Sequence, residues 1–295
     1  MAEIQPLEEP IFVLGTGRCG STSLQRALSC LPRVWIWGEH DGIVQPLNRI
    51  WQLLQGDSAL SKFHFNAPKA TDLLELTKHR TGDATSLAWV NGFDRESVRR
   101  ASAEFMRNLF ATNLPPGKTV WGFKEIRYGP DNQVPLFLLD IFPNARIVYS
   151  ARRAIDTVES SLAAWKADVL KAVANGDPSA LEQLAQAHRE YSDRWLSYGK
   201  YFLNLRNSRP ESVFVSRLED LRSTFSDLRL FLDEPIGEAF AGDLQLPMNE
   251  NRRAPVLLAG ESIRAELNRL HQPYRDAFAQ TETALGYRVR ASVVA

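Results

Sequence analysis

The chain has 295 residues, which is enough to bury a sizeable core in a single α/β domain. Lysine plus arginine and aspartate plus glutamate number 35 each, so the bulk charge gives no indication of binding to nucleic acid or to an anionic membrane. The two cysteines, Cys19 and Cys30, lack metal-ligand or disulfide-scaffold spacing, and the apolar runs are too short to span a membrane. A cytoplasmic location is predicted, because the N-terminal residues also lack the pattern of a signal peptide.

Short apolar segments alternate with helical ones along the chain. In chain order, the pattern predicts a strand at 11–14, a helix at 21–31, a strand at 34–37, a mostly helical segment at 43–115, a strand at 119–123, a helix at 136–142, a strand at 145–150, helices at 155–173 and 180–205, a strand at 212–216, and helices at 219–232 and 261–285. This alternation predicts an α/β fold with a P-loop-like central parallel sheet flanked by helices. We expect one domain over 1–295, with an N-terminal extension at 1–10 and a helical insertion at 43–115.

The first predicted strand runs into a glycine-rich loop, Gly15-Thr-Gly-Arg-Cys-Gly-Ser-Thr22, and then into a helix. Glycines let backbone N–H groups approach phosphate oxygens, and the N-terminus of the helix adds unpaired N–H groups and a partial positive charge. The G-x-G-x-x-G pattern of dinucleotide-binding folds fits Gly15, Gly17 and Gly20, with Glu39 near the place of a ribose-binding acid. An ordinary glycine-rich turn is the remaining structural explanation.

The ATP-binding pattern G-x-x-x-x-G-K-[ST] also nearly fits the loop, but Ser21 stands where the lysine is required. An ATPase or kinase needs that lysine for the β- and γ-phosphates, so Mg-ATP chemistry is disfavoured. No metal-ligand spacing occurs elsewhere in the sequence. Arg18 leaves a cation inside the loop, and a fixed cation can stabilise a leaving phosphate without a metal.

A second basic site follows the strand predicted at 145–150. Arg152 stands at the end of this strand, and Ser160 follows eight residues later, after about two turns of helix. Both side chains can therefore face one anion above the sheet, at the same edge as the glycine loop. A solvated basic cluster at the start of a surface helix is the alternative.

In this order, the strand–G-x-G-R-x-G-[ST]-T–helix and strand–R-x7-S–helix segments resemble the sulfotransferases that use 3′-phosphoadenosine 5′-phosphosulfate. The layout is most similar to the tyrosylprotein-sulfotransferase-like branch and its bacterial relatives, through the loop at 18–22, Gly38-Glu39, Lys124 and the F-P-N-A-R segment at 142–146. The resemblance implies that Arg152 and Ser160 contact the 3′-phosphate of this donor. It implies contacts to the 5′-phosphosulfate from Gly17, Arg18, Cys19, Gly20, Ser21, Thr22 and Ser23.

Sulfuryl transfer to a hydroxyl needs a base for the acceptor and stabilisation of the leaving phosphate. Glu39 is the predicted base, and His40 is the alternative. Neighbours in an extended segment point in opposite directions, so only one of the two is expected to reach the donor. Lys124, at the end of a buried strand, and Arg18 are predicted to stabilise the leaving group. The alternatives are that Glu39 is a surface acid paired with an arginine and that Lys124 packs its stem at the sheet edge.

The sequence also departs from the family pattern. Leu218 stands where a tyrosine is expected, and the late G-x-x-G-x-W-K loop is missing. The basic residues at 251–253 can close over the 3′-phosphate in its place, and a flexible basic turn is the alternative. A Rossmann-type NAD(P)-dependent oxidoreductase gives Arg152 and Ser160 no task, and a non-catalytic nucleotide-binding module gives Glu39 and Lys124 none. The acceptor, a hydroxyl-bearing small molecule or a peptide tyrosine, is left open, as is the oligomeric state, a homodimer included.

Overall fold

A computed structural model describes residues 9–55, 94–234, 258 and 260–288 of the chain. Within them, five parallel strands form one sheet in the order β2-β3-β1-β4-β5. The strands are β1 (Ile11–Gly15), β2 (Val34–Trp37), β3 (Val120–Glu125), β4 (Arg146–Ala151) and β5 (Val213–Arg217). The predicted α/β fold with a central parallel sheet is confirmed, and each predicted strand is present.

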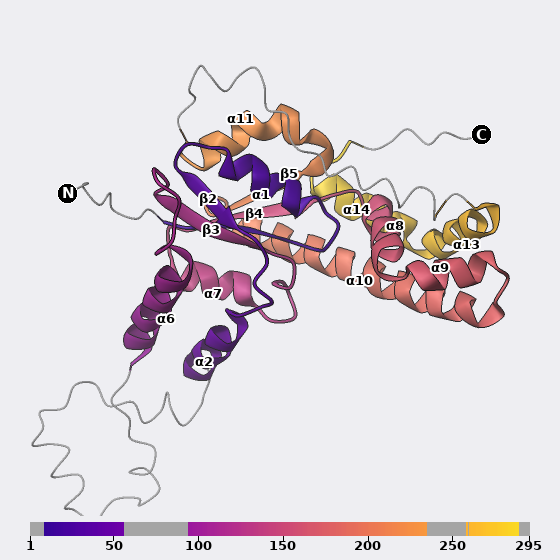
Figure 1. The fold of residues 1–295 in the computed structure, drawn as a ribbon, viewed down its shortest axis with the longest axis horizontal. Coiled ribbons are helices and arrows are strands. Elements are labelled where there is room, and N and C mark those ends of the chain that lie inside the picture. Colours follow the sequence, from indigo (N-terminus) through magenta and orange to yellow (C-terminus); the bar gives the residue numbers. More distant parts are fainter. Residues whose placement is uncertain (1–8, 56–93, 235–257, 259, 289–295) are drawn as a thin grey trace, which may run out of the picture.

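The central strand β1 is buried on both faces of the sheet. Ile11 and Val13 belong to one apolar cluster with residues of α1 (Ser21–Ser29) and α11 (Leu221–Phe231). Phe12 and Leu14 point to the opposite face and join a larger cluster with residues of α7 (Val134–Ile141) and α10 (Pro178–Ser208). Figure 1 shows these helices on the two sides of the sheet. A strand covered on both faces reads as a continuous apolar run, which is why residues 11–14 were recognisable as a strand.

The segment predicted as a helical insertion, 43–115, contains α2 (Gln45–Gln55) and α6 (Arg95–Phe110), which pack on each other and on α7. Asp94 caps α6 by accepting a hydrogen bond from the N–H of Ser97 at 2.5 Å. The middle of the predicted insertion, 56–93, lies outside the described residues, as do residues 1–8 of the predicted N-terminal extension.

Two helices predicted as continuous are each divided. The segment 155–173 forms α8 (Ala154–Trp165) and α9 (Ala167–Ala174), because the backbone leaves the helical region at Lys166, with φ −132°. No glycine or proline marks this break in the sequence. The segment 261–285 forms α13 (Glu261–His271), a 3₁₀ turn (Gln272–Tyr274) and α14 (Arg275–Ala284). Here the break has a local cause, because Pro273 has no N–H to continue the helix.

The strand order creates a crevice at the carboxyl ends of β1 and β4. From β1 the chain passes through α1 to the β2 edge of the sheet, whereas from β4 it passes through α8, α9 and α10 to the β5 edge. Neighbouring strands whose connections leave in opposite directions form the place where open α/β sheets bind ligands. The glycine loop follows β1 and Arg152 follows β4, so both lie at this crevice.

A buried polar chain joins the helices α8, α10 and α13. His188 of α10 contacts His271 of α13 through Nε2 and Nδ1 at 2.9 Å, and Nε2 of His271 lies 3.3 Å from a carboxylate oxygen of Glu159 on α8. Both imidazoles are buried. Burial, followed by the nearby charge of His271, lowers the pKa of His188 to about 4.

This burial predicts an acid-sensitive contribution to stability. The folded state holds His188 with a pKa of about 4, below the value of 6.5 for an unperturbed imidazole, so the unfolded state binds the proton more readily. The stabilisation is fully present above pH 6.5 and is lost as the pH falls from 6.5 towards 4. It amounts to about 3 kcal/mol. Urea unfolding between pH 7.5 and 4.5 measures it, and His188→Gln should remove this part of the pH dependence. Parallel curves for the two proteins would contradict the account.

Candidate active site

The glycine loop presents the N-terminus of α1 to the crevice. Gly20 is the N-cap residue, with φ +88°, and it has no side chain to pair with the first-turn N–H groups of the helix. A Cβ at Gly20 would also lie 2.6 Å from a methyl carbon of Leu218. Arg18 adopts the left-handed backbone conformation, with φ +66°. This conformation is uncommon for residues other than glycine, and strained residues of this kind cluster at active sites and ligand-binding sites. The loop is therefore shaped to expose backbone N–H groups to an anion.

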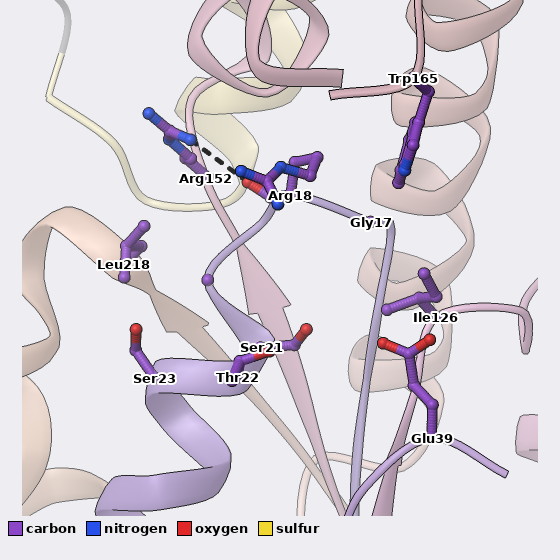
Figure 2. Close-up of a pocket in the computed structure, with 11 residues that line it drawn as sticks. Gly17, Arg18, Ser21, Thr22, Ser23, Glu39, Ile126, Arg152, Trp165 and Leu218 are labelled. Carbon is purple, nitrogen blue, oxygen red and sulfur yellow. Dashed lines mark hydrogen bonds between the residues drawn. The ribbon is translucent and has the colours of Figure 1, made fainter. Parts of the chain in front are cut away.

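A cleft of about 420 Å³ opens in front of this loop. As Figure 2 shows, Arg152 and Leu218 lie at one end of the cleft, Glu39, Ile126 and Trp165 lie at the other, and the loop lies between them. The cleft thus brings together groups that follow the ends of all five strands. The predicted site residues that line it are Gly17, Arg18, Gly20, Ser21, Thr22, Ser23, Glu39 and Arg152.

Two residues that sequence reasoning did not single out form an apolar wall of the cleft. Trp165 ends α8 with 48% of its surface exposed, and a Cβ on Gly17 would lie 2.2 Å from its ring. Ile126, directly after β3, approaches the same glycine, with its Cδ1 at 3.4 Å from that Cβ position. Trp165 reaches this place at the unpredicted break between α8 and α9, so the helical pattern gave no signal for it.

Arg18 joins the two predicted phosphate sites. Its Nε donates a hydrogen bond to Oγ of Ser160 at 3.1 Å, and its carbonyl accepts one from Nη1 of Arg152 at 3.3 Å. Ser160 is 7% exposed and is not among the residues that line the cleft. Arg152 therefore faces the cleft, whereas Ser160 lies behind the side chain of Arg18. Direct contact of Ser160 with a phosphate stays a prediction.

Cys19 directs its side chain away from the cleft. The thiol is buried and donates to the carbonyl of Thr16 at 2.6 Å, and the carbonyl of Cys19 accepts from Oγ of Ser150 at 3.1 Å. Burial raises the pKa of the thiol, so it remains neutral. Only the backbone N–H of Cys19 can serve the ligand contact implied by the family resemblance.

Glu39 and Lys124 form a direct ion pair at the other end of the cleft. Nζ of Lys124 donates to Oε1 of Glu39, and Nη1 of Arg127 donates to Oε2 of the same carboxylate at 3.3 Å. The Lys124 side chain is buried, whereas 34% of the Glu39 side chain is exposed. A proton acceptor that lines the cleft is therefore paired with a cation behind it, since Lys124 is not among the lining residues. The ends of β2 and β3 hold the two groups together.

His40 takes the opposite direction from Glu39. Its ring packs edge-on against Phe123 with centroids 4.5 Å apart, and it lies near the rings of Phe110 and Tyr128. Burial lowers the pKa of His40 despite the neighbouring charge of Glu125. Of the two candidate bases, Glu39 is the one that lines the cleft.

Among residues 9–55, 94–234, 258 and 260–288, no group of three histidine, cysteine or acidic side chains is placed to hold a metal ion. In the same ranges, no helix combines the length and the apolar character that crossing a membrane requires.

A protein-family sequence model with the description "Sulfotransferase family" matches residues 10–206, which is more than half of the chain. The chain belongs to this family. The matched region runs from the start of β1 into α10 and contains the glycine loop, Glu39, Lys124 and Arg152.

Two solved structures are similar to the chain at low sequence identity. The sulfotransferase domain of the Synechococcus PCC 7002 olefin synthase is 17% identical, with a TM-score of 0.50, and the match covers 97% of this chain and 98% of that one. A sulfotransferase from Alicyclobacillus acidocaldarius is also 17% identical, with a TM-score of 0.41 and coverage of 92% and 98%. None of the curated proteins matches the chain.

The left-handed conformation of Gly20 can be tested by substitution. Gly20→Ala should lower the free energy of unfolding by about 1–2 kcal/mol, because a Cβ is disfavoured at φ +88°. Gly38→Ala is the matched control, since its added Cβ would find only the Gln25 amide, at 3.9 Å. Denaturant unfolding compares them. Equal stability of the two variants would show that the loop does not need the left-handed residue.

Proposed function

We propose that the chain transfers a sulfuryl group from 3′-phosphoadenosine 5′-phosphosulfate to an acceptor hydroxyl by a single in-line displacement. The observation that carries the proposal is the composition of one cleft. A phosphate-binding loop, a second cation and a carboxylate paired with a lysine all line its walls or reach it from the strand ends. The observed membership of the sulfotransferase family supports the same reaction class.

The donor carries phosphates at both its 5′ and its 3′ positions, so it needs two anion-binding places. The N–H groups at the start of α1 and the hydroxyls of Ser21 and Thr22 provide one, which suits the 5′ end. Arg152 provides the other. Within the described residues its guanidinium contacts a carbonyl and no carboxylate, so its charge is available to a phosphate. Leu218 lines the same end of the cleft as Arg152 and offers apolar surface to a nucleoside.

The chemistry assigns one task to each group at the other end of the cleft. Glu39 accepts the proton of the acceptor hydroxyl as the new sulfur–oxygen bond forms and the bond from sulfur to the phosphate oxygen breaks. Lys124 and Arg18 donate hydrogen bonds to the phosphate oxygen that gains charge. An ammonium group has three N–H donors, so Lys124 can hold Glu39 and still reach the leaving oxygen.

The acceptor enters beside Glu39 in this proposal. Ile126 and the half-exposed Trp165 form the neighbouring wall, which suits the aryl or alkyl part of an alcohol or phenol. A small molecule and a peptide tyrosine both meet this requirement.

We place the reaction in the cytoplasm, in keeping with the unpaired thiols of Cys19 and Cys30.

The strand order disfavours the rival dehydrogenase hypothesis. The classical Rossmann order places β2 next to β1, so that the acid after β2 reaches the ribose of a nucleotide bound at β1. Here β3 lies between β1 and β2, and the carboxylate of Glu39 is held by Lys124. Glu39 resembled a ribose-binding acid only through its distance along the chain from the glycine loop.

Donor binding can be tested by thermal stability with three nucleotides. At about 100 times its Kd, 3′-phosphoadenosine 5′-phosphate should stabilise the protein by about 2.7 kcal/mol, whereas NAD and ATP should have little effect. Arg152→Ala should weaken this binding about 10- to 100-fold, because a charged hydrogen bond is lost. Arg26→Ala, an exposed arginine on α1, is the control and should bind normally. Stabilisation by NAD alone would overturn the proposal.

The role of Glu39 can be separated from donor binding. Glu39→Gln should keep the affinity for the bisphosphate, yet reduce turnover about 10²- to 10⁴-fold, the usual contribution of a general base. Release of the bisphosphate from the donor, in the presence of 4-nitrophenol or tyrosine amide, measures turnover. If Glu39→Gln instead loses bisphosphate binding, the carboxylate belongs to the donor site and not to proton transfer.

A further inference from the structure

Glu125, the last residue of β3, carries a carboxylate with no exposed surface. It follows Lys124 directly, and because strand neighbours point to opposite faces, it turns away from the cleft that Lys124 serves. The proposed transfer reaction gives this carboxylate no task. A buried charge of this kind is costly unless hydrogen bonds compensate it, so its partners indicate what it is for.

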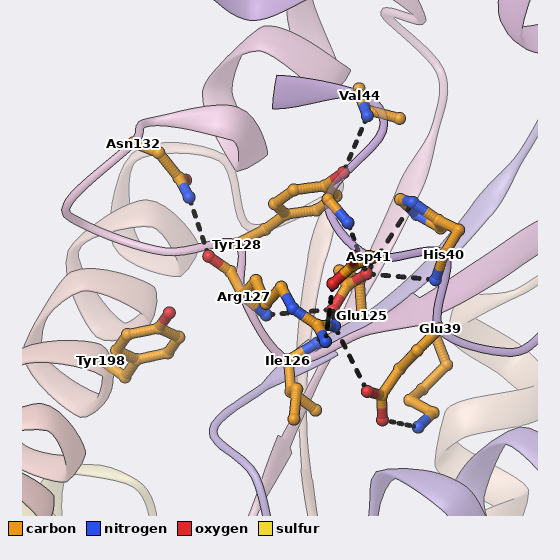
Figure 3. Close-up of polar contacts among 12 residues, drawn as sticks. Glu39, His40, Asp41, Val44, Glu125, Ile126, Arg127, Tyr128, Asn132 and Tyr198 are labelled. Carbon is orange, nitrogen blue, oxygen red and sulfur yellow. Dashed lines mark hydrogen bonds and ion pairs between the residues drawn. The ribbon is translucent and has the colours of Figure 1, made fainter. Parts of the chain in front are cut away.

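One oxygen of Glu125 holds the loop that follows β2. Oε2 accepts hydrogen bonds from the backbone N–H groups of His40 and Gly42, each at 3.3 Å (Figure 3). Pairing of β2 with β3 ends at Trp37, so the sheet does not provide partners for these N–H groups. Asp41 and Gly42 both have positive φ, +56° and +78°, which leaves the loop without regular structure. The carboxylate therefore supplies the hydrogen-bond acceptors that pairing between strands does not provide for these N–H groups.

The other oxygen holds the loop that follows β3. Oε1 accepts from the backbone N–H groups of Ile126 at 2.9 Å and Arg127 at 3.3 Å, and from Nη1 of Arg127 at 2.7 Å. Burial alone would raise the pKa of Glu125, but the hydrogen bonds from Arg127 and from these backbone groups outweigh it and lower the pKa. The carboxylate is thus ionised and saturated with donors.

Both loops lead directly to the groups proposed for catalysis. Glu39 is the residue before His40, and Lys124 is the residue before Glu125. Nη1 of Arg127 adds a third link, because it contacts Oε1 of Glu125 and Oε2 of Glu39 at the same time. A shift of either loop would separate the carboxylate of Glu39 from the ammonium of Lys124.

We propose that Glu125 is a positioning residue for sulfuryl transfer: its buried carboxylate clamps the loops after β2 and β3 so that Glu39 and Lys124 meet at the cleft. This inference rests on the proposed function. It differs from a general stabilising role because its effect is confined to two loops, and the phosphate-binding loop after β1 makes no contact with Glu125 in the hydrogen bonds of the described residues.

The chemistry of the clamp requires a group that only accepts hydrogen bonds. A carboxylate presents two acceptor oxygens, whereas a glutamine presents one acceptor and one donor. In Glu125→Gln the amide nitrogen must face either the N–H groups of His40 and Gly42 or the guanidinium and N–H groups of Arg127 and Ile126. One loop therefore loses its anchor in either orientation, although the size of the side chain is kept.

A second buried glutamate provides a matched control. Glu234 is also buried, and its carboxylate accepts from Nη2 of Arg33 at 3.0 Å. Arg33 directly precedes β2, so this pair lies at the opposite end of the sheet from the cleft. Glu234→Gln should lower stability through the loss of a buried charge pair without any effect on the two loops.

Hydrogen exchange of the ligand-free proteins tests the clamp. In Glu125→Gln, peptides covering 38–44 and 126–129 should exchange about ten-fold faster or more than in the wild type, while the peptide covering 15–24 is unchanged. Glu234→Gln should show none of these local changes. Unchanged exchange at 38–44, or faster exchange spread evenly over the chain, would overturn the inference.

Kinetics with 4-nitrophenol or tyrosine amide add the functional readout. Glu125→Gln should lower kcat about 10²-fold, as expected for a displaced reacting group, with the Kd for 3′-phosphoadenosine 5′-phosphate within about two-fold of the wild type. Glu125→Asp keeps the charge, but its shorter side chain reaches only one loop, so its kcat should lie between those of the wild type and Glu125→Gln. This variant replaces Glu125→Gln in the test if the glutamine variant does not fold. A kcat equal to that of Glu234→Gln would contradict positioning. Failure of the wild type to bind the bisphosphate would refute the proposed function alone, since the exchange result does not depend on it.

Discussion

The register of β1 between β3 and β4 is the constraint on which the site depends. Val13 is paired with Lys124, and Gly15 is paired with Ser150, two residues before Arg152. Parallel pairing brings the carboxyl ends of these strands to one level, so the glycine loop, the lysine and the arginine open onto the same crevice. A slip of one residue would turn Lys124 to the opposite face of the sheet and separate it from Glu39.

The charge of the cleft is local, in a chain whose acidic and basic residues balance. Arg18, Lys124 and Arg152 come from three different strand ends, and the N-terminus of α1 adds its partial positive charge between them. Glu39 is the carboxylate among the residues that line the cleft, and it is paired with Lys124. This distribution suits a doubly phosphorylated donor at one end and proton transfer at the other.

Much of the fold was predictable because local patterns determine it. The apolar runs of the five strands are short and bounded by glycine, proline or charged residues. The three central strands are buried on both faces, which removes any ambiguity about which face is covered. The glycine loop and Arg152 were recognisable because each follows such a run directly. The strand order was not predictable in the same way, because it depends on which connections cross the sheet and not on any one segment.

The site residues that sequence reasoning missed are those defined by tertiary contacts. Glu125 reads as one more charged residue after a strand, and only the arrangement of two loops shows that its carboxylate is enclosed. Trp165 faces the cleft because a helix breaks at Lys166 without a glycine or proline. Ser160 was expected beside Arg152, but the long side chain of Arg18 lies against it, and the sequence carries no information on the direction of that side chain.

A crystal structure with bound 3′-phosphoadenosine 5′-phosphate tests the central claim most directly. The account predicts the 5′-phosphate within hydrogen-bonding distance of the backbone N–H groups of residues 20–23, and the 3′-phosphate beside the guanidinium of Arg152. Lys124 should then lie within reach of the 5′-phosphate. A nucleotide bound in the reverse direction, or outside the cleft between the glycine loop and Arg152, would contradict the account.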